Sequence, residues 1–133
     1  MKLDIYLNFR GTCEEAFHFY EQHLGGKIIF MQRHRENPNP NIPDDWKDKV
    51  SHAQMQIGGV GVMGADIPNA EPMRSAYVSL TLDRPEEAER IYQALTDGGE
   101  VFMKMEKTFF ANRFAMFRDR FGISWMLLQG VKL

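Results

Sequence analysis

The 133-residue chain contains a single cysteine, Cys13, so no disulfide can form within it. It has no apolar run near the roughly 20 residues that a membrane helix needs, and its first residues lack a signal-peptide pattern. Neither sign of charge dominates: 16 Lys and Arg residues stand against 18 Asp and Glu residues, without the basic surplus of a nucleic-acid-binding face. We therefore expect a cytoplasmic protein that binds neither nucleic acid nor membrane.

The composition that remains is that of a globular protein with a substantial core. Hydrophobic residues make up 44% of the chain and aromatic residues 12%, while the mean hydropathy is -0.40. A chain of this length buries roughly two-thirds of its unfolded surface in one domain. It needs no disulfide or metal ion to fold.

One pattern occurs twice. Residues 14–20 and 86–92 each carry Glu-Glu-Ala followed by a tyrosine four positions after the alanine, and each copy precedes a glycine pair. An alternating, strand-like run comes before each copy and an apolar run follows it. The chain is thus predicted to be a tandem duplication, one domain made of two modules at about residues 1–68 and 74–133.

The local patterns predict an α+β fold. In residues 4–9, polar Asp4, Tyr6 and Asn8 alternate with apolar residues, as in a half-buried strand. Thr12 is expected to cap the first helix, and Pro85 fits the first turn of the second. Further strands are expected at about residues 27–33, 52–57, 60–63, 77–82, 101–105, 114–118 and 123–128.

Residues 37–48 hold three prolines among Asn and Asp, a composition that excludes both an α-helix and a strand ladder. The second module has no equivalent. The segment is either a flap over a site, with Trp46 as its contact, or a surface excursion.

Residues 59–64 satisfy the glycine spacing of a dinucleotide-binding loop. That motif works only where a strand leads into a helix whose N-terminus holds the pyrophosphate. Pro68 and Pro72 follow here, so we expect a hairpin turn and a tightly packed strand instead.

Several motifs together resemble one known family. They are Tyr6-Leu7-Asn8-Phe9, Phe19-Tyr20, Gly58-Gly59, Met63-Gly64 with Asp66, and Asp119-Arg120-Phe121-Gly122 with Trp125. On these motifs the chain resembles the glyoxalase/bleomycin-resistance/extradiol-dioxygenase, or vicinal oxygen chelate, superfamily and its PhnB-like subgroup. The resemblance implies tandem βαβββ modules that form a curled mixed sheet around a cleft, commonly in a homodimer.

In metal-using members of that superfamily, four side chains converge on one divalent ion. The matching positions here are Asp4, Met63, Tyr77 and Met126, of which only Asp4 is a good ligand for a hard cation. A shift of one residue gives no better set. We therefore expect neither a resident metal ion nor a cofactor.

The predicted cleft is lined by the non-core faces of the strands. His52 is a weak candidate for acid–base catalysis, because histidine titrates nearest neutral pH. Cys13 lies at a helix start, where the helix dipole favours a thiolate, although it also fits a plain helix-entry position. The full set of expected ligand-binding residues is Asp4, Tyr6, Asn8, His52, Gln54, Met63, Tyr77, Ser79 and Met126.

Three functions fit the sequence. The first is a metal-free homodimeric protein that binds a small aromatic or amphipathic molecule. The second is a metal-dependent lyase, isomerase or dioxygenase of the same superfamily. The third is a dimeric interaction module with a vestigial cleft.

Overall fold

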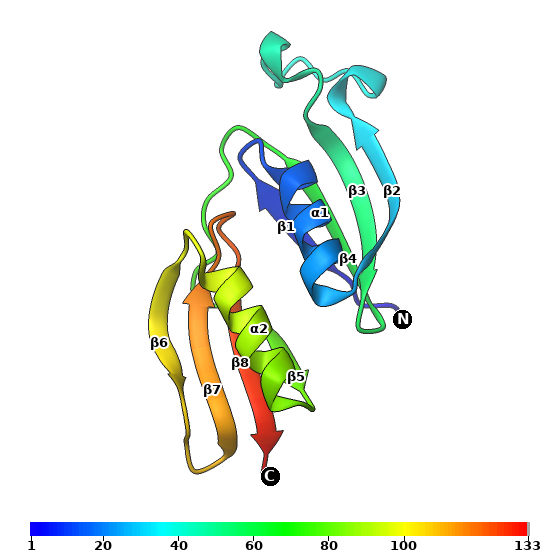
Figure 1. Ribbon diagram of the computed structural model, residues 1–133. Helices are drawn as coiled ribbons and strands as arrows, with labels where there is room; N and C mark the ends of the chain where they lie inside the picture. Colours follow the sequence, from blue (N-terminus) through cyan, green and yellow to red (C-terminus); the bar gives the residue numbers. More distant parts are fainter. Residues whose placement is uncertain (133) are drawn as a thin grey trace. The chain divides into compact units, whose positions relative to one another are not determined.

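The computed structural model describes residues 1–132 and divides the chain after Glu71 into two compact units. Each unit runs strand, helix and three strands, as Figure 1 shows. The division falls inside the predicted linker between the modules. Neither helix in the described chain has the length and apolarity to cross a bilayer. That the two modules form a single domain stays a prediction.

The helices and strands follow the predicted order along the chain. The first unit contains β1 (Ile5–Phe9), α1 (Cys13–Leu24), β2 (Lys27–Arg33), the short 3-10 helices η1 (His34–Glu36) and η2 (Asp44–Trp46), β3 (Val50–Ile57) and β4 (Val60–Asp66). The second contains β5 (Val78–Leu82), α2 (Pro85–Thr96), β6 (Glu100–Glu106), β7 (Ala111–Arg118) and β8 (Ser124–Val131).

Both units have the same mixed sheet. The strand order is β1-β4-β3-β2 in the first and β5-β8-β7-β6 in the second, with β1 parallel to β4 and β5 parallel to β8. The remaining neighbours are antiparallel. The α+β fold and the paired βαβββ topology are therefore confirmed.

Each core lies between the helix and one face of its sheet. In the first unit, Phe17 and Tyr20 of α1 are buried with Phe9 and Met55 of the strands. Phe9 and Phe17 meet edge to face at 6.1 Å between ring centroids. Because side chains alternate along a strand, the neighbouring residues occupy the opposite face of the sheet.

The start of α1 corrects a prediction. Thr12 occupies the N-cap position, but its side chain makes no capping hydrogen bond. Instead, the buried carboxylate of Asp66 accepts hydrogen bonds from the backbone N–H groups of Cys13 and Val50, both at 2.9 Å. Asp66 satisfies an orphan helix donor from the end of β4, a strand that extends three residues beyond the predicted end.

Residues 37–48 contain no α-helix or ladder, as expected, but Asp44–Trp46 forms one 3-10 turn that was not predicted. Gly58 and Gly59 adopt positive φ angles of 55° and 79° in a hairpin turn. A Cβ on Gly64 would lie 2.9 Å from the ring of Phe17, so close packing explains this glycine. Residues 60–66 form a strand and not the start of a helix, so the glycines at 59–64 do not form a dinucleotide-binding loop, as expected.

Candidate ligand-binding face

The face of the first sheet that α1 does not cover carries a row of side chains across all four strands. Tyr6 pairs with Met63, Met63 with Gln54 and Gln54 with Phe30. His52 lies one row away, opposite Gln32 of β2. We call this surface the open face, defined by Tyr6, Asn8, Phe30, His52, Gln54 and Met63.

Aromatic rings gather at the centre of the open face. The hydroxyl of Tyr6 lies 3.1 Å from Nδ1 of His52, and the two rings stack at 5.7 Å between centroids. Phe30 approaches the same imidazole at 6.0 Å. Tyr6 and Phe30 nevertheless remain 47% and 44% exposed. These rings form a platform that the protein's own core does not cover.

The protonation of Tyr6 suits this contact. Burial raises the pKa of the Tyr6 phenol, with a smaller contribution from the charge of Cys13. The phenol therefore keeps its proton at neutral pH and can donate it to Nδ1 of His52. In that arrangement the other ring nitrogen, Nε2, carries the imidazole proton.

Polar groups border the aromatic rings. The side-chain amide of Gln54 lies 3.9 Å from the sulfur of Met63, and Asn8 is exposed further along β1. An apolar surface with a few placed polar groups is typical of small-molecule sites.

Asp4 lies just before β1, beside this row. Its Oδ1 atom is buried and has no hydrogen-bond partner among the described residues, while its Oδ2 lies 3.8 Å from the ammonium of Lys2. A Cβ on Gly61 would collide with that carboxylate. Asp4 and Gly61 also border a hollow of about 50 Å³, so the buried oxygen lies beside a space for a small hydrogen-bond donor.

The second unit repeats the row with different chemistry. Ser79 pairs with Met126, Met126 with Met116 and Met116 with Met103. This row matches the Tyr6 row strand for strand, but a serine takes the place of Tyr6, and methionines take the places of Gln54 and Phe30. Methionine provides adaptable packing surface rather than directed hydrogen bonds.

Tyr77 precedes β5 and contacts a neighbouring aromatic residue. Its ring meets Phe102 edge to face at 6.5 Å, and the guanidinium of Arg118 lies 5.2 Å from the Phe102 centroid. Tyr77 is thus held against β6 on the second sheet.

The structure places the nine predicted cleft residues on two sheets. In the first unit Tyr6, Asn8, His52, Gln54 and Met63 share the open face with Asp4 at its border; in the second, Ser79 and Met126 share a row and Tyr77 directly precedes β5. The joining of all nine into one cleft stays a prediction. Phe30 was missed, because a register shift between Ile28 and Phe30 breaks the alternation of β2 from which its face would be read.

The residues at the expected metal positions do not fit a divalent ion. Within the first unit the register sets Tyr6, not Asp4, beside Met63, and a methionine and a tyrosine are poor partners for a hard cation. Residues 1–132 contain no group of three or more His, Cys, Asp and Glu side chains that could hold a metal ion.

Cys13 does not have the environment of a nucleophile. It is fully buried, and burial together with the neighbouring Asp66 and Glu14 carboxylates raises the pKa of its thiol far above the usual range. The effect expected from the helix dipole is therefore outweighed by desolvation and by negative charge.

Comparison with known proteins identifies the class. The model of the glyoxalase/bleomycin resistance protein/dioxygenase superfamily matches residues 2–127, and the chain belongs to that superfamily. The sequence is 29% identical over 139 residues to protein YjdN of Escherichia coli K12, covering 96% of this chain and 94% of YjdN. The family predicted from the sequence motifs is confirmed.

Solved structures share the fold. Protein PA1353 from Pseudomonas aeruginosa is 41% identical, with a TM-score of 0.86 and 98% of each chain covered. The PhnB protein from Bacillus cereus has a TM-score of 0.85 at 24% identity, covering 98% of this chain and 100% of PhnB, and shares the fold. The fosfomycin resistance protein FosX from Listeria monocytogenes shares the fold at a TM-score of 0.69 and 11% identity, covering 99% of this chain and 94% of FosX.

Proposed function

We propose that this protein binds a small aromatic or amphipathic molecule on the open face of its first sheet, without a resident metal ion. The observation that carries the proposal is the exposed Tyr6–His52–Phe30 cluster, in which rings are stacked and hydrogen-bonded yet remain open to solvent. Aromatic side chains bind planar apolar groups, and the phenol and imidazole add polar contacts that fix orientation.

In this proposal the residues have separate roles. Tyr6 and Phe30 supply stacking surface, and His52 holds the Tyr6 ring in place through its hydrogen bond. Gln54 and Asn8 accept or donate hydrogen bonds at the border, and the buried Asp4 oxygen accepts from a donor group of the ligand. Tyr77, Ser79 and Met126 offer a more adaptable, methionine-rich surface on the second sheet.

The metal-dependent alternative is less favoured because its donor set is missing. Of the four expected positions, only Asp4 has a side chain that is a good ligand for a hard cation. The similarity to FosX, at 11% identity, is evidence for a shared fold and not for shared chemistry. Homodimerisation belongs to the same proposal, since family members commonly dimerise. Light scattering during size-exclusion chromatography tests the dimer.

A thermal-shift screen against a library of small aromatic compounds tests the binding function. A compound at a hundredfold its Kd should stabilise the protein by about 2.7 kcal/mol. Tyr6→Ala should strongly reduce the affinity for a compound found in the screen and lower the melting temperature only slightly. Tyr92→Ala removes an α2 ring that packs on Phe117, so it should lower the melting temperature and leave the affinity nearly unchanged. The opposite ranking would assign Tyr6 to structure rather than binding.

A further inference from the structure

A pocket lies in the first unit, away from the open face, in the segment that joins β2 to β3. Its volume is about 630 Å³, within the range of roughly 300–1,000 Å³ that is typical of small-molecule sites. Three prolines between residues 38 and 43 line it together with His34, Ile42, Asp44 and Lys47. It shares no residue with the open face, and the short 107–110 connection of the second unit has no equivalent segment.

Backbone hydrogen bonds hold the walls of this pocket. The N–H of His34 donates to the carbonyl of Lys49 at 2.9 Å, and that of Arg35 donates to the carbonyl of Lys47 at 3.0 Å. Within the proline-rich turn, the N–H of Ile42 donates to the carbonyl of Asn39 at 3.1 Å. The hollow is thus framed by paired backbone rather than by side chains alone.

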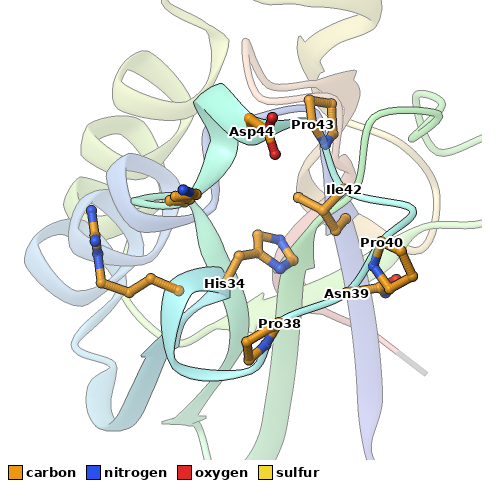
Figure 2. A pocket seen from close by; sticks show the side chains of 9 residues that line it. His34, Pro38, Asn39, Pro40, Ile42, Pro43 and Asp44 are labelled. Carbon is orange, nitrogen blue, oxygen red and sulfur yellow. The ribbon is translucent and has the colours of Figure 1, made fainter.

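His34 presents a hydrogen-bond acceptor to the pocket. Its Nε2 lies 2.9 Å from the carbonyl oxygen of Asp66, and because a carbonyl only accepts, Nε2 must carry the proton. The neutral ring therefore has its lone pair on Nδ1, which has no partner among the described residues. His34 is only 8% exposed, and Figure 2 shows its ring extending into the hollow with Ile42 and Asp44 around it.

The charges of the lining are complementary to a zwitterion. Asp44 and Lys47 make no ion pair within residues 1–132, so one carboxylate and one ammonium are available. Arg35, by contrast, is neutralised by its ion pair with Asp48. Ile42 and the prolines supply apolar contact between the charged groups.

We propose that this pocket binds a small zwitterion of the amino-acid type with a hydrocarbon side chain. The ammonium of the ligand donates to Nδ1 of His34 and to the Asp44 carboxylate, and its carboxylate pairs with Lys47. The side chain packs on Ile42 and the prolines.

Three related compounds test the class of ligand. L-Leucine carries both charges, 3-methylbutylamine lacks the carboxylate, and 4-methylpentanoate lacks the ammonium. Each is titrated into the full chain, and ¹H–¹⁵N spectra follow the backbone amides and the His34 ring nitrogens. We expect leucine to shift amides of residues 34–47 and the Nδ1 signal of His34, with the amine binding at least about fivefold more weakly and the acid more weakly still.

Variants separate the contacts. Asp44→Asn should weaken leucine and the amine alike by about tenfold, whereas Asp45→Asn, a neighbouring carboxylate outside the lining, should leave both unchanged. Lys47→Gln should reduce leucine binding to the level of the amine. His34→Gln keeps a donor for the Asp66 carbonyl and replaces Nδ1 by an amide oxygen at a different place in the pocket, so leucine and the amine should both bind more weakly to a protein that is still folded.

Each contrary result would overturn the inference. In the titrations, the contrary results are 4-methylpentanoate binding as tightly as leucine, amide shifts confined to the open face, or no shift at residues 34–47 up to the solubility limit of leucine. Among the variants, the contrary result is an equal effect of Asp44→Asn and Asp45→Asn on leucine binding.

Discussion

The hydroxyl of Tyr6 lies 3.1 Å from Nδ1 of His52, and this contact joins the edge strand β1 to β3 across β4. The two residues are 46 positions apart in the chain, and both belong to the side of the sheet opposite the helix. A hydrogen bond between two partly exposed rings adds little to stability, but it fixes the orientation of both. This is why we propose a role in ligand binding for the pair.

Tyr6→Phe tests the hydrogen bond by itself. The variant keeps the stacked ring and removes the hydroxyl, so the free energy of unfolding should change by no more than about 0.5 kcal/mol. The ¹⁵N shift of His52 Nδ1 should change, and the affinity for any open-face ligand should fall. A melting temperature that drops by many degrees would show that the contact is structural.

Asp66→Asn should destabilise the first unit by about 1.5–3 kcal/mol, because the native carboxylate accepts from two backbone N–H groups. An amide turns a donor toward one of these groups and leaves it unsatisfied. Urea denaturation measures the change. Asp45→Asn is the matched exposed control, and equal stability of the two variants would contradict the role assigned to Asp66.

Cys13 should be unreactive in the native protein. Its thiol pKa is raised by burial and by nearby carboxylates, so Ellman's reagent at pH 8 should modify it only on the timescale of unfolding. The raised pKa also fixes the sign of a pH effect. The contribution of the protonated Cys13 thiol to the free energy of unfolding is complete below the pKa of a free thiol, about 8.5. It is lost as the pH rises above that value, because the thiol then ionises in the unfolded chain but not in the folded one. Rapid modification of folded protein would refute this prediction.

The ion pair between Glu14 and Arg33 should add a small, pH-dependent contribution. The Arg33 guanidinium donates to both Glu14 oxygens, at 2.9 and 2.7 Å, and holds the pKa of that carboxyl below its usual range. Stability from Glu14 is therefore present above the unfolded pKa of about 4.3 and is lost as the pH falls through the lower folded value.

The partly exposed pair limits the size of that effect. Glu14→Gln should cost about 0.2–1 kcal/mol at pH 7 and nothing at low pH, as measured by chemical denaturation. Glu71→Gln, an exposed position, serves as the control. A cost that persists unchanged in acid would mean that packing, rather than charge, accounts for it.

The sequence predicted the fold well because its signals were local. Period-two alternation located Tyr6 and Asn8 on one face, and the repeated Glu-Glu-Ala segment revealed the duplication. Side chains that act across the chain were harder to predict. The cap supplied by Asp66 lies 53 residues from the helix start that it satisfies, so Thr12 was the wrong choice on sequence alone.

No pattern in the sequence could have predicted the pocket around His34. The segment was predicted as irregular, but irregular composition does not show where its walls close. Trp46, the residue expected to contact a ligand from a flap, lies instead near the turn at Gly11, where a Cβ added to that glycine would be 3.8 Å from the indole ring. Whether the segment moves stays a prediction.

The most direct test of the central claim is a titration of the chelator-treated 133-residue chain with 2-naphthol, a small amphipathic aromatic, followed by ¹H–¹⁵N spectra. The account predicts saturable shifts at Tyr6, Phe30 and His52, unchanged by added Mn²⁺, Ni²⁺ or Zn²⁺ and lost in Tyr6→Ala. Binding that appears only after a divalent ion is supplied, or shifts that leave the open face untouched, would contradict it.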